Sequence, residues 1–255
     1  MNDPALTTSF CLALRPPFVK CFNICNVCII RGDQSTANVI KPFLFEQYWT
    51  REPSVCALWM NHDNDYLNFL TDKYAHFGDR FCAFERLERT NECKLVGVCV
   101  ANKIFPWEPT ELEEWAHATP SVPERSRMYF TAHCYKNANL WKKYHVDYIY
   151  EIEVLVTAAE VTGHGVGTLL LKHVLKDALL LRHPLIQVIC TNKYAARICE
   201  KCNMKKEWSL DYTDFVDDAG QSIFYPRAPH TTCEIYIKKF NQAEAAALPC
   251  LPEVY

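Results

Sequence analysis

The stretch EVLVTAAEVTGHGVGTLLLK, Glu153–Lys172, decides the fold. Within it a pattern typical of a strand changes to a spacing typical of a helix, and a cluster of glycines separates the two. Before the glycines, β-forming side chains dominate Asp147–Val156, so a central strand is predicted there. After them, leucines repeat on one helical face over Thr168–Arg182, which predicts a helix. The glycines between these elements are three of only seven in the chain: Gly163, Gly165 and Gly167.

A glycine-rich turn between a strand and a helix can bind an anion. Without side chains the backbone can approach a ligand closely, and the unpaired amides at the start of a helix attract a phosphate. A tight turn that only eases helix packing would show the same spacing, so both interpretations stay open. The Gly-Lys-Ser/Thr of ATPase phosphate loops is absent, and so is an early βαβ unit with a dinucleotide fingerprint. The turn therefore predicts a phosphate held by main-chain amides.

Composition limits the class of protein and its partners. The chain has 255 residues, 49% of them hydrophobic and 22% charged, which is the balance of a soluble protein with a sizeable core. We expect a single domain over 1–255, with an ordered core at about 18–240 and loose termini. A net charge of −3 disfavours nucleic acid as a partner. No apolar run approaches the roughly 18 residues of a membrane span, so no membrane partner is expected. We expect a monomer in the cytoplasm.

The chain contains 14 cysteines and has no recognisable secretory signal, so these are expected to be reduced thiols. Two clusters have spacings that a metal site could use: Cys21, Cys25 and Cys28, and the pair Cys199 and Cys202. Neither supplies the four ligands of a tetrahedral zinc site. No metal is therefore predicted, and a cysteine-ligated metal protein is kept only as the weakest of three interpretations.

The remaining pattern alternates between strands and helices, which indicates the α/β class. Further strands are predicted at 22–30, 80–85, 94–100, 185–190, 205–212 and 234–239. Further helices are predicted at 35–49, beginning at an N-capping Ser35, and at 66–77, 137–143 and 193–202. The segment Ile104–Arg127 is rich in Pro, Glu and Trp and has no clear period, so a long loop is expected there, with one helical turn around Thr110–His117.

The strand and the glycine turn together resemble the Gcn5-related N-acetyltransferase superfamily. Its signature, Arg/Gln-x-x-Gly-x-Gly/Ala, is similar to Thr162–Gly167, with Thr162 in the place of Arg or Gln. About thirty residues later the superfamily has Asn-x-x-Ala-x-x-x-Tyr-x-x-x-Gly-Phe. The residues at those positions here are Asn192, Ala195, Cys199, Asn203 and Met204, so a cysteine replaces the tyrosine.

Other stretches resemble the invertebrate arylalkylamine N-acetyltransferases. Phe45–Pro53 is similar to the first helix of that family, which ends in Glu-Pro-Leu and carries the catalytic base; Ser54 replaces the leucine. Leu140–Tyr144, the segment from Tyr212 to His230, and Lys238-Lys239 also resemble the family. The likeness covers roughly residues 20–240, and the order of the motifs is its specific signal.

This resemblance implies a fold and an activity. The fold would be a mixed, mostly antiparallel central sheet flanked by helices, of the acyl-CoA N-acyltransferase type. The activity would be transfer of an acetyl group from acetyl-CoA to the primary amine of a small arylalkylamine, by direct attack in a ternary complex. The residues implied to hold coenzyme A are Val154, Leu155, Val156, Thr162, Gly163, His164, Gly165, Val166, Gly167, Thr168 and Asn192.

The chemistry requires a base, because an alkylammonium with a pKa near 10.4 must lose a proton before it attacks. Glu52 is the candidate base, acting through ordered water. A glutamate before proline is also typical of a capping or surface position. Cys199 is the candidate acid for the leaving thiolate, although cysteines on helices more often pack in the core. Tyr48 and Trp49 are candidates to line the amine site, and each could equally be a core residue.

Two alternatives of other kinds stay open. A non-catalytic acyl-CoA-binding protein of the same fold would explain the departures at Thr162 and Cys199. An acyltransferase for another class of amine would keep the same catalytic residues with a different amine pocket.

Overall fold

The computed structural model describes residues 26–61, 63–87 and 92–240, which group into two compact units. The first unit comprises the described parts of Met1–Asn102 and Glu153–Leu171. The second comprises Lys103–Ile152 and the described part of Lys172–Tyr255. The chain passes from one unit to the other three times, within the strands Cys93–Ile104 and Ile149–Thr157 and within the helix Val166–Leu180, so every link is part of regular structure.

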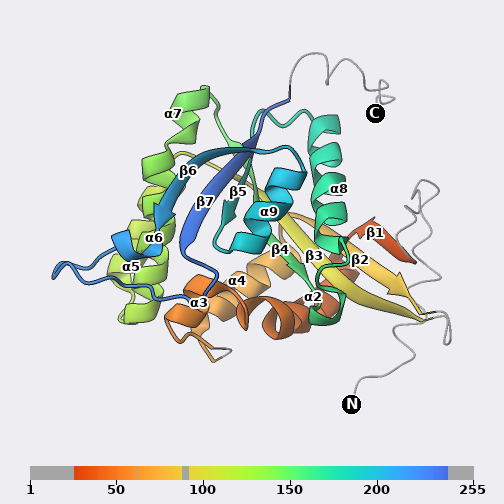
Figure 1. The fold of residues 1–255 in the computed structure, drawn as a ribbon, viewed down its shortest axis with the longest axis horizontal. Coiled ribbons are helices and arrows are strands. Elements are labelled where there is room, and N and C mark those ends of the chain that lie inside the picture. The colour runs from red at the N-terminus through yellow and green to blue at the C-terminus, as the bar shows by residue number, and fades with distance from the viewer. Residues whose placement is uncertain (1–25, 62, 88–91, 241–255) are drawn as a thin grey trace. The chain divides into compact units, whose positions relative to one another are not determined.

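The strands form a mixed seven-stranded sheet in the order β1-β2-β3-β4-β5-β7-β6 (Figure 1). In the first unit β2 is antiparallel to both β1 and β3; in the second, the start of β4 is parallel to β5, and β7 is antiparallel to β5 and β6. The predicted α/β class with a mixed sheet is confirmed. The bounds are β1 Val27–Arg31, β2 Asp79–Arg86, β3 Cys93–Ile104, β4 Ile149–Thr157, β5 Ile186–Cys190, β6 Lys205–Asp211 and β7 Thr232–Lys238.

The helical segment predicted at 35–49 exists, but it is not one regular helix. It consists of the 3-10 turn η1 (Gln34–Thr36), α2 (Ala37–Leu44) and the π-helical turn η2 (Phe45–Trp49). Ser35 does not cap it: the Asp33 carboxylate accepts a hydrogen bond from the Ser35 amide at 2.9 Å. Two further helices follow in this unit, α3 (Pro53–Ala57) and α4 (Asp65–His76), the second of which was predicted.

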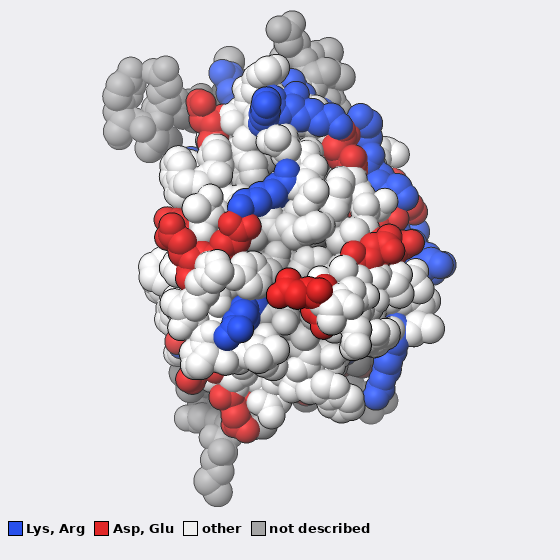
Figure 2. Space-filling model, turned by 90° about the vertical axis from the view of Figure 1, so that its left-hand side faces the viewer, with Lys and Arg blue, Asp and Glu red and all other residues white. Residues whose placement is uncertain are grey.

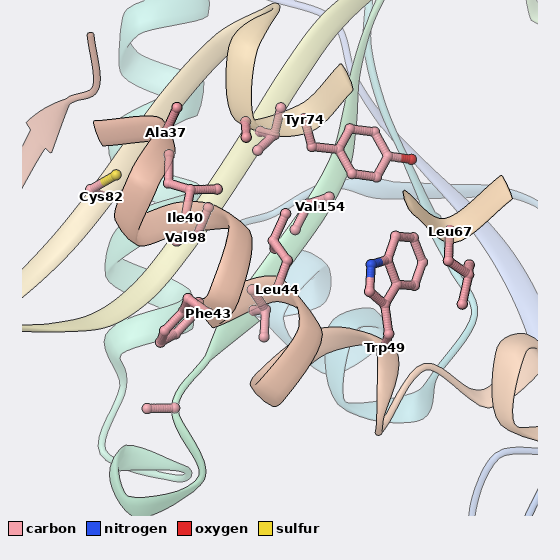
Figure 3. Packing of buried hydrophobic residues seen from close by; sticks show 14 of the residues in the cluster. Ala37, Ile40, Phe43, Leu44, Trp49, Leu67, Tyr74, Cys82, Val98 and Val154 are labelled. Carbon is pink, nitrogen blue, oxygen red and sulfur yellow. The ribbon is translucent and has the colours of Figure 1, made fainter. Parts of the chain in front are cut away.

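The core of the first unit lies between these helices and the strands (Figure 3). Ile40 and Leu44, one helical turn apart, are fully buried and belong to one cluster with Val98 of β3 and Val154 of β4. The spacing of four residues places both side chains on one face of α2, which is why the helix packs on the sheet by that face.

Gly97 of β3 lets helix α8 (Val166–Leu180) approach the sheet in the first unit. A Cβ atom at this position would lie 2.8 Å from Leu170 Cδ1 and 3.3 Å from Val166 Cγ1. Cβ atoms are essentially never found at the shorter distance, so any side chain at this position forces Leu170 to shift. Because Val166 and Leu170 are in the first turns of α8, this contact sets the position of the helix start that follows the glycine turn.

The second unit contains α5 (Glu108–Ala118), α6 (Val122–Ala138), α7 (Leu140–Tyr144) and α9 (Lys193–Lys201). Helices α5 and α6 pack against each other, and α9 contacts β5 and β7. The loop predicted over Ile104–Arg127 is therefore wrong. Its prolines suggested broken structure, yet Pro109 and Pro123 lie in the first turns of α5 and α6, where a missing amide proton costs no helical hydrogen bond.

Nine cysteines of the described part of the chain are free thiols, and most are buried. Cys93, at the start of β3, is disulfide-bonded, so the expectation of reduced thiols throughout is wrong at this position. Composition says nothing about which two thiols lie within bonding distance. Cys21 and Cys25 lie outside the described residues.

Within the described ranges, no group of three or more His, Cys, Asp or Glu side chains could hold a metal ion. None of the helices described there is both long and apolar enough to cross a membrane.

We predict that substitution of Gly97 destabilises the protein in proportion to the size of the new side chain. Gly97→Ala requires Leu170 to move, and Gly97→Val adds two more methyl groups to the same space, so Gly97→Val should lower the free energy of unfolding by about 1–3 kcal/mol. Urea denaturation measures the change. A valine variant as stable as the wild type would contradict the packing role of Gly97, because restriction of the unfolded chain alone raises stability only slightly.

Candidate active site

Glu52 is the most deeply buried carboxylate of the first unit, with 2% of its surface exposed. It is the N-cap of α3: its Oε2 atom accepts hydrogen bonds from the Val55 amide at 2.6 Å and from the Ser54 hydroxyl at 2.7 Å. Pro53 occupies the first turn, where its fixed φ suits the helix start. The capping role considered from the sequence is therefore real. Ser54, which departs from the resembled motif, supplies a hydrogen bond that a leucine cannot.

The second oxygen of this carboxylate has a different environment. Glu52 Oε1 is buried and has no hydrogen-bond partner among the described residues. A buried carboxylate oxygen normally has a partner, because leaving it unpaired costs roughly 1–3 kcal/mol. The carboxylate is thus held rigidly through Oε2, while Oε1 keeps a lone pair available to a ligand or a water molecule.

Three side chains preceding Glu52 bind main-chain groups of β4 and of the residues just after it. The Tyr48 hydroxyl donates to the Glu153 carbonyl at 3.4 Å, and the Arg51 guanidinium donates to the Thr157 carbonyl at 2.5 Å. The Gln47 side-chain oxygen accepts from the Ala159 amide at 2.9 Å. We call these three contacts the β4 clamp. Sequence reasoning missed Gln47 and Arg51, because nothing local indicates hydrogen bonds that span more than a hundred residues.

Tyr48 and Trp49 have different environments. Trp49 is 5% exposed, belongs to the core cluster (Figure 3), and donates its indole N–H to the Thr71 hydroxyl at 2.7 Å. These contacts account for Trp49 as a core residue. Tyr48 is only partly buried, and its ring stacks at a tilt on Trp49, with 4.6 Å between centroids. Of the two residues predicted to line an amine site, Tyr48 is the more accessible.

The glycine turn joins η3 (Ala159–Val161) to α8. Gly163 and Gly165 have φ values of +85° and +89°, which residues with a side chain rarely adopt. A Cβ atom at either position would meet no protein atom within 4 Å. Packing therefore does not require these glycines. They are required by the backbone conformation, and they leave open space beside the main chain.

The amides of the turn are available for an anion. Among the described residues no hydrogen bond is recorded from the amides of Gly163, Gly165, Val166 or Gly167, whereas the His164 amide donates to the Val161 carbonyl. Such amides at the start of a fifteen-residue helix attract negative charge. The Thr162 and His164 side chains are exposed at the same turn. Within β4, Val154 and Val156 are buried and Leu155 is partly buried, as expected for alternating side chains.

The acidic side chain next to the glycine turn, Glu160, interacts with two basic side chains, those of Lys94 and Arg51. The hydrogen bond from Lys94, at 2.6 Å, holds the pKa of the Glu160 carboxyl below its usual value. Burial lowers the pKa of the Arg51 guanidinium, an effect that the Glu160 carboxylate opposes. The acid next to the turn is thus neutralised by cations and does not cancel the attraction of the free amides for a phosphate.

Asn192 and Cys199 lie in the second unit. The Asn192 side chain caps α9 by accepting from the Ala195 amide at 2.8 Å. Cys199 is fully buried, and its Sγ is 3.6 Å from Sγ of Cys190. Burial raises the pKa of Cys190 well above its ordinary value, and the neighbouring thiol adds to the rise. The surroundings of Cys199 are those of a packed core thiol.

No protein-family model matches the sequence. Solved structures do match. A mosquito arylalkylamine N-acetyltransferase like 5b has a TM-score of 0.75 at 19% identity over 84% of this chain and 100% of its own. The Drosophila melanogaster polyamine N-acetyltransferase, which forms N-acetylagmatine, has a TM-score of 0.73 at 21% identity over the same shares. Arylalkylamine N-acetyltransferase 2 of Aedes aegypti has a TM-score of 0.75 at 18% identity, covering 85% of this chain and 100% of its own.

At these identities the likeness concerns the fold. The chain has the fold of the Gcn5-related N-acetyltransferases, as the glycine turn and the motif order predicted. It covers the whole of each of these three structures.

We predict that two substitutions of Glu52 will differ in their effect on the free energy of unfolding, which separates its capping role from any chemical role. Glu52→Ala removes the acceptor for the Val55 amide and the Ser54 hydroxyl, so the free energy of unfolding should fall by about 1–3 kcal/mol. Glu52→Gln keeps an oxygen for these donors and should stay within about 1 kcal/mol of the wild type. Urea denaturation of both variants tests this. Equal losses in the two variants would contradict the capping interpretation.

Proposed function

We propose that the chain is an N-acetyltransferase that transfers the acetyl group of acetyl-CoA to the primary amine of a small arylalkylamine. The observation that carries the proposal is the divided environment of the Glu52 carboxylate, with one oxygen fixed by α3 and the other buried without a partner. A carboxylate held in this way suits a general base, because its position is set and its free lone pair can take a proton.

The reaction needs that proton acceptor. The neutral amine nitrogen forms a bond to the thioester carbonyl carbon, and the carbon–sulfur bond then breaks. Before the attack, the ammonium proton passes to Glu52 Oε1, through a water molecule where the amine does not reach it. After the attack, one of the two N–H protons of the tetrahedral intermediate passes through water to the leaving thiolate, so coenzyme A departs as the thiol. Glu52 needs no covalent intermediate for this role, so direct attack within a ternary complex is the simplest sequence.

The glycine turn would hold the pyrophosphate of coenzyme A. Its unbonded amides supply donors, and the open space beside Gly163 and Gly165 lets a phosphate approach the main chain. Because Thr162 lacks the charge of an arginine, binding here would rely on main-chain donors. The main chain near Leu155 and Val156 is the proposed donor to the developing oxyanion. We assign the acid role of Cys199 less weight, because its thiol is fully buried against Cys190.

The amine class has two candidates. The matched structures include arylalkylamine N-acetyltransferases and also proteins described as agmatine or polyamine N-acetyltransferases. The partly buried ring of Tyr48, four residues before Glu52 and hydrogen-bonded to β4 through its hydroxyl, favours an aromatic amine, because aromatic rings pack well against one another. The nine free thiols among the described residues favour a reducing compartment such as the cytoplasm, whereas the disulfide at Cys93 counts against it.

Release of free thiol from acetyl-CoA tests the proposal directly. We expect release to depend on added amine, with tyramine and dopamine ahead of agmatine. Glu52→Gln should lower kcat by about a hundredfold or more, the usual contribution of a general base, while CoA affinity stays near wild type. CoA binding without amine-dependent release would instead support the acyl-CoA-binding protein, and a preference for agmatine would support the other amine class.

The proposed CoA cradle makes a second prediction. Valine at φ near +89° is strained and would fill the space reserved for phosphate, so Gly165→Val should weaken CoA binding by about tenfold or more. Thr162→Ala should change it less than about twofold, because the contacts are main-chain. Calorimetric titration with CoA measures both.

Gly220 offers a matched control for this experiment. Its φ is +77°, and a Cβ there also meets no atom within 4 Å. Gly220→Val therefore introduces comparable strain outside the proposed cradle and should leave CoA affinity unchanged. If Gly220→Val weakened CoA binding as much as Gly165→Val, the loss would come from general destabilisation and the cradle assignment would fall.

A further inference from the structure

A cavity of about 460 Å³ lies in the second unit and shares no residue with the candidate active site. Its walls come from α5, the end of α6, α7 and the segment that follows α7. The volume is in the range of small-molecule sites, which run from about 300 to 1,000 Å³. Nothing in the proposed acetyl transfer uses it.

Two aromatic side chains form the apolar part of the wall, Tyr135 and Trp141. The Tyr135 hydroxyl donates to the buried Glu151 carboxylate at 2.5 Å, and the Trp141 indole N–H donates to the Ile104 carbonyl at 3.3 Å. The polar atoms of both rings are therefore engaged inside the protein. Tyr135 and Trp141 are 6% and 9% exposed, so each offers the cavity only a small area of carbon surface, to which Pro106, Pro109 and Val146 add. Together these residues give the cavity an apolar side on which an apolar ligand group can lie.

All charged side chains that line the cavity are basic. Lys136 and Lys142 line the cavity, and no acidic residue does. Lys136 is paired with Glu113 of α5, whereas Lys142 has no ion pair among the described residues. Figure 2 views the side on which α5, α6 and α7 lie in Figure 1, and acidic and basic groups are scattered together over it. The lack of acids in the cavity is thus a local feature, which favours an anionic ligand group.

The backbone around α7 explains how its residues come to line the cavity. Asn139 and His145, on either side of this five-residue helix, both have left-handed φ values, of +42° and +53°. Asn139 caps the end of α6 and His145 caps the end of α7, as left-handed residues commonly do. Here they fold the chain so that Asn139, Trp141 and Lys142 all reach the cavity. The Asn139 side chain adds a hydrogen-bonding amide to the wall.

We propose that this cavity binds a small carboxylate with an aromatic body, the ring lying against Trp141 and Tyr135 and the carboxylate reaching Lys142 and Asn139. The proposal does not rest on the acetyltransferase function, because it uses residues of the second unit alone. An arylalkylamine fits the wall less well, since its ammonium would meet lysines with no carboxylate lining the cavity.

The test uses the full chain and three probes with the same phenyl ring: 3-phenylpropionate, 3-phenylpropionamide and phenethylamine. Ligand-observed NMR titration measures their affinities. We expect the carboxylate to bind with a dissociation constant of about 0.1–3 mM, as its eleven heavy atoms allow. The amide should bind more weakly, by about threefold or more, because it lacks the negative charge of the carboxylate. The loss is modest, since the contact of that charge with lysine is partly exposed to solvent. The titration is repeated with saturating CoA and in Glu52→Gln, and neither should change the affinity of the carboxylate.

Matched variants locate the site. Lys142→Gln should weaken 3-phenylpropionate about three- to fivefold. Lys143→Gln, its neighbour, removes a lysine that binds Glu207 and does not line the cavity, and it should have no effect. Thr110→Trp places a ring in the cavity from exposed α5 and should abolish binding, with the melting temperature reporting that the protein still folds.

Three results would overturn the proposal. The first is equal affinity for the acid and the amide. The second is equal binding by Lys142→Gln and Lys143→Gln. The third is displacement of 3-phenylpropionate by CoA, which would place the probe in the candidate active site. Absence of binding by any probe up to 10 mM, about three times the weakest affinity expected, would also reject it.

Discussion

The β4 clamp is the constraint on which the candidate site depends. Gln47, Tyr48 and Arg51 come from the π-helical turn and the residues just after it, and each binds a main-chain group of β4 or of the turn that follows. Glu52 is the next residue along the chain. The clamp fixes the position of Glu52 relative to β4 and the glycine turn. Because its partners on the β4 side are main-chain groups, mutation of a side chain of β4 removes none of the three contacts. Mutation of a clamp side chain removes one of them.

Glycines serve the same region for two different physical reasons. Gly97 is needed because Leu170 and Val166 of α8 occupy the space of its missing side chain. Gly163 and Gly165 are needed because the turn has positive φ values, while the space beside them is open. The first glycine fixes where α8 begins, and the other two expose the amides that precede it. A helix start that is rigidly placed and openly accessible is what an anion site requires.

The sequence predicted the strands and most helices well, because alternation and helical spacing report directly on burial, as for Ile40 and Leu44. It failed at Ile104–Arg127, where prolines that begin α5 and α6 resembled prolines that break helices. The single helix predicted at 137–143 is also wrong, because α6 ends and α7 begins on either side of Asn139. At the site, the motif order indicated Glu52 and the glycine turn. It could not indicate that Trp49 bonds Thr71 inside the core, or that Arg51 reaches Thr157, because such contacts depend on tertiary structure.

The two hydrogen bonds to Glu52 Oε2 also bear on how relatives of this chain should be compared. A relative without enzymatic activity would still be under selection to keep the glutamate, because α3 needs a cap. Retention of this residue in an alignment is then evidence for the helix and not for the reaction. The informative difference between an active and an inactive homologue would be whether its second oxygen acquires a partner, for example from a new basic or hydroxyl side chain.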